Sequence, residues 1–291
     1  MAVSPGLSLE RVHRPGDQPV CHLLFHPIAP GESRDPLDSV AGVPDTDGGS
    51  PTAVCNAMTS NSESPGNAVV VFLGMHRAGT SLLARIGQRL GVELGDNLKG
   101  PRADNPEGFF EHADIVDRII SINRRLHRSP MRPEGLLPYP ADWWRDEAFA
   151  ADIEALRETV RYEVARADLW GFKDPHSIRM LPMWTELLTG LGLRPHFVIS
   201  VRRPEEVVES VVARDPVTRL HAETLWLTHY TEGIRASDGF PRTIVSFEEW
   251  FGDPLPQAQA LARFVGLPEP GADSETAADV RGCVKPTLHH H

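Results

Sequence analysis

The sequence is poor in cysteine and carries an excess of negative charge. Its 291 residues include three cysteines, Cys21, Cys55 and Cys283, too few and too scattered for a disulfide framework or a zinc cluster. Lysine and arginine number 29 against 40 aspartates and glutamates, so the net charge is −11. A nucleic-acid-binding protein needs a basic face, which this charge argues against. We therefore expect a reducing cytoplasmic location and no nucleic-acid partner.

Membrane, export and metal signals are also lacking. No apolar run approaches the roughly 18 residues that a membrane span requires. The N-terminus has no basic stretch followed by an apolar one, so we expect no signal peptide. The 13 histidines show no His-Glu-x-x-His spacing, and the terminal triplet 289–291 has no second ligand cluster beside it in the sequence. We predict neither a membrane span nor a bound metal.

Residues 1–66 differ in composition from the rest of the chain. They contain nine prolines and seven glycines, with eight acidic and three basic residues. No helical or strand period persists there, and the apolar patch 20–25 is too short to suggest a domain. This composition predicts a disordered N-terminal arm over 1–66. A single folded domain is then expected over 67–291.

In that domain, predicted strands alternate with predicted helices. Apolar segments predict strands over 69–73, 169–172, 196–201 and 243–247. Helical patterns follow at 82–90, 113–126, 147–167, 178–191, from Pro204, 219–236 and 255–266. This alternation predicts an α/β fold, a P-loop-type parallel sheet with helices on both faces. Ligands of such sheets bind at the C-terminal ends of the strands.

The segment 74–81, Gly-Met-His-Arg-Ala-Gly-Thr-Ser, joins the first predicted strand to the first helix. Its G-x-x-x-x-G frame matches a Walker A loop, in which backbone amides and the helix N-terminus hold an anionic phosphate. The Walker lysine that would reach the outer phosphates of a nucleoside triphosphate is missing, and Arg77 lies inside the loop instead. The pattern therefore keeps the anion-binding part and loses the part specific for triphosphates.

Two motifs resemble those of sulfotransferases that use 3′-phosphoadenosine 5′-phosphosulfate (PAPS). Residues 77–81 resemble the loop for the 5′-phosphosulfate, Lys/Arg-Ser-Gly-Thr-Thr/Ser, except that Ala78 replaces the serine. Arg202 ends a predicted strand, and Ser210 follows eight residues later, a spacing similar to the family's 3′-phosphate site. The resemblance implies PAPS as donor and adenosine 3′,5′-bisphosphate as product. The residues that it assigns to the donor are Arg77, Ala78, Gly79, Thr80, Ser81, Arg202 and Ser210.

A third motif, Lys173-Asp174-Pro175, follows a predicted strand and resembles a segment of some sulfotransferases, the tyrosylprotein type among them. The lysine of that segment contacts the group being transferred. Sulfuryl transfer builds negative charge on the departing phosphate oxygen, and fixed cations stabilise that charge in the transition state. We assign this role to Lys173 and Arg77. Asp174 either orients Lys173 or caps the helix that follows.

Two residues are candidates for the base that removes the acceptor's proton. Glu111 follows two aromatic residues in a segment, 105–111, that resembles the acceptor-pocket lining of bacterial sulfotransferases. Desolvation by those aromatics would raise its pKa. His176 titrates near neutrality without help, although related sequences often carry arginine there. We favour Glu111 and keep His176 as the alternative.

The sequence thus predicts a sulfotransferase, with two other classes still open. A small-molecule kinase should carry Gly-Lys-Ser/Thr in the loop, which this chain lacks. A non-catalytic module for adenosine bisphosphate should lack Lys173 and a nearby base, both of which are present. The expected acceptor is a small molecule or a glycan. The pair Trp143-Trp144 and Trp184 belong either to the acceptor pocket or to the core.

Overall fold

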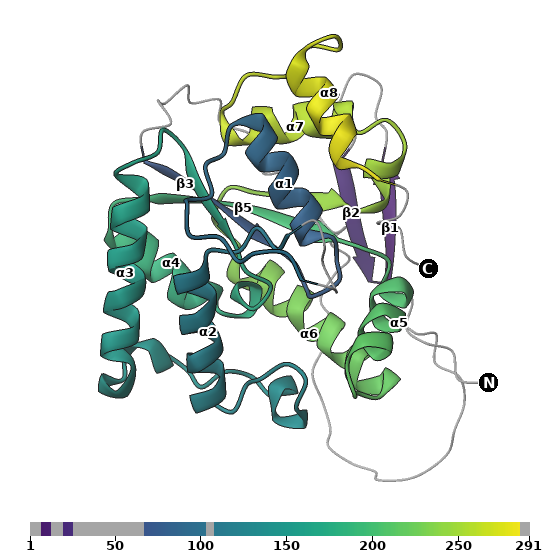
Figure 1. Cartoon of the computed structure of the whole chain (residues 1–291). Helices are drawn as coiled ribbons and strands as arrows, with labels where there is room; N and C mark the ends of the chain where they lie inside the picture. The colour runs from purple at the N-terminus through teal and green to yellow at the C-terminus, as the bar shows by residue number, and fades with distance from the viewer. Residues whose placement is uncertain (1–6, 13–19, 26–66, 103–107, 286–291) are drawn as a thin grey trace, which may run out of the picture. The chain divides into compact units, whose positions relative to one another are not determined.

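The computed structural model describes residues 7–12, 20–25, 67–102 and 108–285, which belong to two units, Met1–Ser62 and Glu63–His291 (Figure 1). In the first unit, β1 (Leu7–Val12) and β2 (Val20–Phe25) pair antiparallel from Leu7↔Phe25 to Val12↔Val20. The composition of this segment did not indicate these strands. The rest of the arm predicted over 1–66 lies outside the described residues, so its disorder stays a prediction.

The second unit is built on a four-stranded parallel sheet. Its strands are β3 (Ala68–Leu73), β4 (Trp170–Lys173), β5 (Arg194–Val201) and β6 (Arg242–Ser246), in the order β4-β3-β5-β6. The predicted α/β class with a parallel sheet is confirmed. The chain passes from β3 to β4 on one side and then returns to β5 on the other. This reversal creates a switch point at the C-terminal end of β3, where such sheets bind ligands.

Three helices cover one face of the sheet. α1 (Thr80–Leu90) packs against α7 (Leu255–Val265) and α8 (Glu275–Cys283), as Figure 1 shows. Their apolar side chains share a core with Phe72 and Val198 of the sheet. The sequence patterns did not indicate α8, because the side chains that it buries include small ones spaced three residues apart. These are Ala277, Val280 and Cys283.

Helices α4 (Leu181–Gly190) and α6 (Arg219–Ala236) cover the opposite face, where the ring of Trp184 lies 4.5 Å from that of Phe172. α5 (Pro204–Arg214) packs on α6, and α2 (Ala113–Arg125) packs on α3 (Ala150–Val164). Short 3₁₀ turns occupy Pro133–Leu136, Trp143–Arg145, Glu147–Phe149, Ser177–Arg179 and Glu248–Phe251.

Two of the predicted helices are longer than the helices in the structure. The helix expected over 147–167 is a 3₁₀ turn followed by α3, and the one expected over 178–191 is a 3₁₀ turn followed by α4. In the second case Pro182 lies in the first turn of α4, where a proline is tolerated. No helix in the described part of the chain is long and apolar enough to cross a membrane.

The tight contact between β3 and β4 gives a stability prediction. A Cβ on Gly171 would lie 2.7 Å from the carbonyl oxygen of Val70 and 2.8 Å from Cγ1 of Val92. We expect Gly171→Ala to lower the free energy of unfolding by about 1–3 kcal/mol, as overpacking does. Urea unfolding measures the change.

Gly190→Ala is the matched control. Gly190 is the last residue of α4, and a Cβ there meets nothing within 4 Å. Alanine is the better helix former, so this variant should be as stable as the original protein or slightly more so. Equal stability of both variants would contradict the close packing of β4 on β3.

Candidate active site

The loop between β3 and α1 is held in one conformation by the strand beside it. Gly74 and Gly79 have positive φ angles of 149° and 81°, and a Cβ on Gly74 would lie 2.8 Å from the carbonyl oxygen of Ser200. The Ser200 hydroxyl donates to the carbonyl oxygen of Ala78 at 2.6 Å. α1 begins at Thr80, so its first N–H groups lie at this loop. Such a helix start favours an anion.

Arg77 connects this loop to α5. Its φ angle is 68°, in the left-handed region, and its Nε donates to the Ser210 hydroxyl at 2.8 Å. Arg202 donates from Nη1 to the backbone oxygen of Arg77 at 3.3 Å. Sequence analysis assigned Arg77 to one end of the donor and the Arg202–Ser210 pair to the other. The structure joins these two predicted sites by direct hydrogen bonds.

Arg202 lies at the end of β5, where its side chain is buried and oriented. Nε and Nη2 donate to Oε2 of Glu206 at 2.9 and 2.8 Å, one turn along α5. The guanidinium lies 4.7 Å from the centre of the Phe247 ring. A planar guanidinium held in this way presents its donors with little loss of side-chain entropy, a geometry suited to phosphate.

Lys173 ends β4 and forms a buried ion pair. Its Nζ lies 2.6 Å from Oε1 of Glu111, with the two side chains 3% and 11% exposed. The same ammonium donates to the Ser81 hydroxyl and to the backbone oxygen of Phe109, each at 3.3 Å. Burying two charges is costly unless they are paired and hydrogen-bonded, and here both conditions hold. The predicted catalytic lysine and the favoured base are therefore partners.

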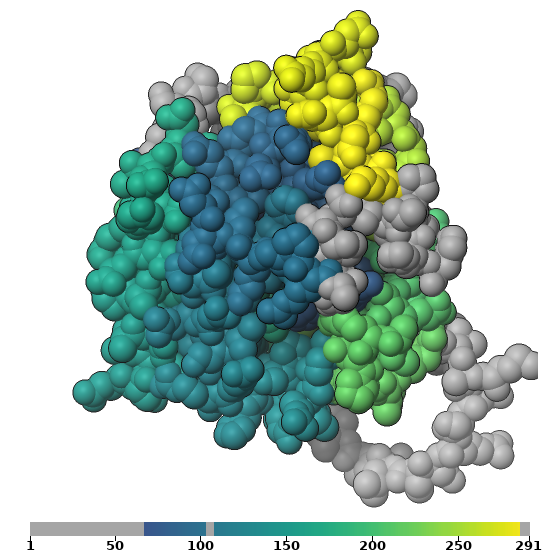
Figure 2. All heavy atoms as spheres, in the orientation of Figure 1, coloured from purple at the N-terminus to yellow at the C-terminus, as the bar shows by residue number. Residues whose placement is uncertain are grey.

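The segment that carries Glu111 crosses in front of the strand ends. Its backbone is held by Lys99, whose N–H donates to the carbonyl oxygen of Glu111 at 2.8 Å. In Figure 2 the blue and dark teal residues that follow α1 form the surface on this side. Lys173 is consequently inside the protein, beneath Phe109 and Glu111. The part of the predicted acceptor-lining segment before Gly108 lies outside the described residues.

His176 belongs to a group of three histidines from different segments. Its ring lies 4.7 Å from that of His76 in the loop, and His76 lies 6.4 Å from His229 on α6. Burial lowers the pKa of His76 well below its usual value, and the positive charge of neighbouring groups adds to this. Burial also lowers the pKa of His229, to about 3. Sequence analysis missed His76 and His229; the position of His76 beside Arg77 was the available signal.

Asp174 fixes the turn that carries His176. Its carboxylate accepts from the backbone N–H of His176 at 3.2 Å and from the Ser177 hydroxyl at 2.7 Å. Trp184 donates to the same hydroxyl at 2.8 Å. Burial, more than any other cause, raises the pKa of the Asp174 carboxyl. Of the two roles predicted for Asp174, these contacts correspond to the capping of the following turn.

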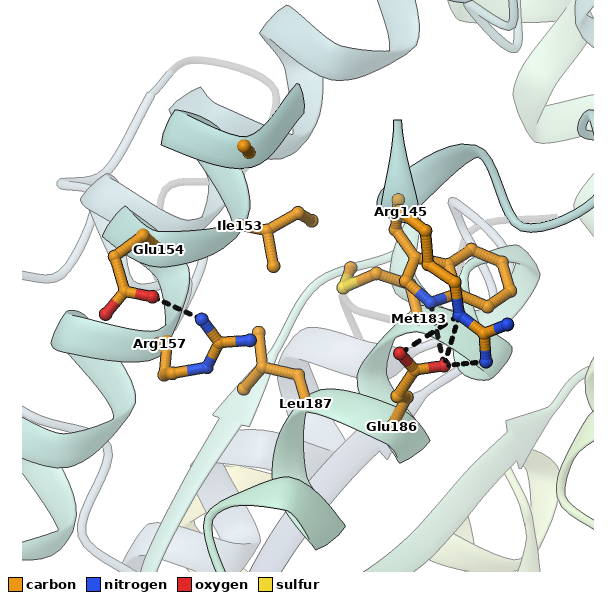
Figure 3. Close-up of a pocket in the computed structure, with 9 residues that line it drawn as sticks. Arg145, Ile153, Glu154, Arg157, Met183, Glu186 and Leu187 are labelled. Atoms are coloured by element: carbon orange, nitrogen blue, oxygen red, sulfur yellow. Dashed lines mark hydrogen bonds and ion pairs between the residues drawn. The ribbon is translucent and has the colours of Figure 1, made fainter. Parts of the chain in front are cut away.

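A cavity of about 440 Å³ lies elsewhere, between α3 and α4 (Figure 3). The charged residues that line it form ion pairs with one another, Arg145 with Glu186 and Arg157 with Glu154. None of the predicted site residues lines it. Trp144 lines it, whereas Trp143 and Trp184 are buried in the core. In the described part of the chain, no group of three or more His, Cys, Asp or Glu residues is arranged to hold a metal.

No family model and no curated protein matches this chain. Three solved structures are similar in part. The sulfotransferase domain of the Synechococcus PCC 7002 olefin synthase is 16% identical, with a TM-score of 0.44 over 77% of this chain and 83% of that chain. The sulfotransferase domain from the curacin biosynthetic pathway is 14% identical, with a TM-score of 0.40 over 74% of this chain and 82% of that chain. A sulfotransferase from Alicyclobacillus acidocaldarius is 16% identical, with a TM-score of 0.33 over 75% of this chain and 87% of that chain. All three TM-scores are below 0.5, so we infer function from the site alone.

The burial of His229 gives a pH prediction. Its pKa in the folded protein is about 3, below the value of about 6.5 in an unfolded chain, so the unfolded state takes up the proton first as pH falls. Between about pH 7 and about pH 5.5 this histidine alone should remove about 1.2 kcal/mol from the free energy of unfolding. His229→Gln should lose that much less over the same range. Urea unfolding at both pH values tests this, and equal losses would contradict a neutral buried His229.

Proposed function

We propose that this protein transfers a sulfuryl group from PAPS to a hydroxyl or amine acceptor in the cytoplasm. One observation carries the proposal: residues assigned from separate motifs converge on the loop after β3. Arg77 reaches Ser210, Lys173 reaches Ser81, and Arg202 reaches the backbone of Arg77. These links span 133, 92 and 125 residues of sequence, so the fold alone brings the motifs together.

The residues present suit a ligand with phosphate groups at both ends. Gly74 and Gly79 let the loop pack closely against Ser200 and Phe247, where a Cβ would collide, and α1 begins directly after Gly79, so its first N–H groups lie at the loop. On this proposal the 5′-phosphosulfate binds to the loop amides, Arg77 and the hydroxyls of Thr80 and Ser81. The 3′-phosphate binds to Arg202 and Ser210. No metal takes part.

The reaction is an in-line displacement at sulfur. A bond forms between the acceptor atom and sulfur while the bond from sulfur to the bridging phosphate oxygen breaks. The electron pair of the broken bond stays on adenosine 3′,5′-bisphosphate, and cations fixed beside that oxygen stabilise the transition state. Lys173 and Arg77 supply these cations. The buried position of Lys173 strengthens its effect, because less water screens it.

The acceptor's proton requires a base, for which Glu111 and His176 remain the candidates. Glu111 already pairs with Lys173, whereas His176 stands on the turn fixed by Asp174. Glu111 contacts Lys173 directly, and His176 follows Lys173 by three residues. We propose a small molecule or a glycan as acceptor. A kinase or a module that only binds adenosine bisphosphate would be revealed by thermal shifts with ATP plus Mg²⁺, or by binding without turnover.

The first functional prediction concerns recognition of the 3′-phosphate. Arg202→Ala should weaken binding of adenosine 3′,5′-bisphosphate by about 1.5–3 kcal/mol, the range for a hydrogen bond to a charged group. Binding of adenosine 5′-phosphosulfate, which lacks the 3′-phosphate, should hardly change. Isothermal titration calorimetry with both ligands measures the difference.

Arg203→Ala is the matched control, because Arg203 is the next residue but its side chain is 68% exposed. It should bind both ligands as the original protein does. If Arg202→Ala loses the two ligands equally, Arg202 does not recognise the 3′-phosphate.

A second functional prediction concerns Lys173. Lys173→Ala should lower the turnover of PAPS by about 10²–10³, the loss typical of one preorganised electrostatic contact. Affinity for adenosine 3′,5′-bisphosphate should change much less, because the contact acts mainly in the transition state. Release of adenosine 3′,5′-bisphosphate from PAPS is followed by chromatography.

The buried partner of Lys173 requires its own control. Removing the lysine leaves the Glu111 carboxylate buried without its ion-pair partner, which itself destabilises folding. Lys173→Ala/Glu111→Gln removes that charge as well and should show at least the same loss of turnover, with a melting temperature closer to the original. Full turnover in either variant would refute the role of Lys173.

A further inference from the structure

His76 occupies the loop position beside Arg77, and its ring turns toward a different neighbour. Arg77 bonds to Ser210 on α5, whereas the His76 ring lies edge-on against His176 after β4. Two ring nitrogens, Nε2 of His76 and Nδ1 of His176, are buried without a hydrogen-bond partner among the described residues. Buried polar atoms of this kind carry a desolvation cost and call for an explanation. Here they occur in the loop assigned to the donor and on the turn that follows Lys173.

We propose that His76 is a catalytic residue and that its Nε2 accepts the proton of the acceptor, with His176 packed beside it. The inference rests on the proposed sulfuryl transfer and names a base other than Glu111. In the step, the acceptor oxygen forms its bond to sulfur and the bond from sulfur to the bridging phosphate oxygen breaks. The electron pair leaves with adenosine 3′,5′-bisphosphate, and the acceptor's proton passes to His76. The imidazolium then releases the proton to solvent.

The pair of Glu111 with Lys173 is the first support. At 2.6 Å from the ammonium, the Glu111 carboxylate already shares its charge with a cation, and protonating it would leave Lys173 buried without its counter-charge. Glu111 is better suited to hold Lys173 beside the leaving oxygen. Protonation of His76 at Nε2 would break no such contact, because no described residue hydrogen-bonds this nitrogen.

Electrostatics around His76 give the second support. The titratable groups that act on it are His176 and Lys173 from the end of β4, His229 from α6 and Arg214 from α5. Asp174 interacts with both His176 and Glu111, and Arg179 interacts with His229. Burial, the largest cause, and the positive neighbours lower the pKa of His76, so its ring is neutral at neutral pH but is a weaker base than a free imidazole. An anionic phosphosulfate in the loop would offset these cations and raise the pKa of His76. Binding of the donor would thus strengthen the base.

The test uses hydrolysis of PAPS, in which water takes the acceptor's place and no acceptor need be known. His76→Ala should hydrolyse PAPS at least about 10²-fold more slowly, the usual contribution of a general base. Its affinity for adenosine 3′,5′-bisphosphate should change less than about threefold, a small energy on the scale of a lost charged contact. Added imidazole should restore part of the rate, increasingly as the pH rises through the pKa of imidazole. A merely structural histidine would not respond to imidazole.

Two further variants complete the test: one covers the case in which His76→Ala does not fold, and the other is a matched control. His76→Gln keeps a polar side chain of similar length and should show the same loss if His76→Ala does not fold. His196→Gln is the matched control, because His196 is another buried histidine with an unpartnered Nδ1 and a pKa lowered by burial, but it lies near the start of β5. It should hydrolyse PAPS at the original rate.

The outcomes separate this inference from the function on which it rests. If the original protein neither binds adenosine 3′,5′-bisphosphate nor hydrolyses PAPS, the proposed function fails. If it does both and His76→Ala keeps its rate, only the role of His76 fails. A loss of rate that imidazole cannot restore would likewise overturn the base role and leave His76 a structural residue.

Discussion

The buried ion pair of Lys173 and Glu111 is the interaction on which the site depends. It lies where β4 ends and ties three parts of the chain together, since the ammonium also bonds to Ser81 in α1 and to the backbone of Phe109. Such a pair is tolerated only when each charge keeps its partner. Consequently the segment across the front of the sheet cannot shift without exposing a bare charge. The fold therefore fixes the position of a cation beside the loop after β3.

A second network of contacts fixes two further cations, Arg202 and Arg77, on the other side of the loop. Arg202 is held by Glu206 and by the ring of Phe247, and it reaches the backbone of Arg77, whose side chain bonds to Ser210. The two networks converge on one loop from β4 and from β5, the strands on either side of β3. Because the sheet reverses its order there, both neighbours deliver their C-terminal residues to the same point. This explains how an acidic chain assembles a cationic site.

Much of this arrangement was predictable from local sequence. The β-branched and apolar run 69–73 and the glycines of 74–81 indicated the strand and its loop, and Arg202 and Lys173 lie at strand ends as expected. Contacts between distant segments were not predictable. Nothing local indicates that Glu111 pairs with Lys173 or that His76 meets His176, because both depend on how the sheet orders its strands. The sequence patterns did not indicate α8, because the residues on its buried face are small. The roles assigned to the site residues stay predictions.

On the proposed function, this site holds PAPS by both of its phosphate ends. A crystal structure of the complex with adenosine 3′,5′-bisphosphate tests it most directly. We expect the 5′-phosphate against the amides of residues 74–81, near Arg77 and Lys173, and the 3′-phosphate within hydrogen-bond distance of Arg202 and Ser210. A nucleotide bound elsewhere, such as the cavity between α3 and α4, or absent from the crystal at saturating concentration, would contradict it.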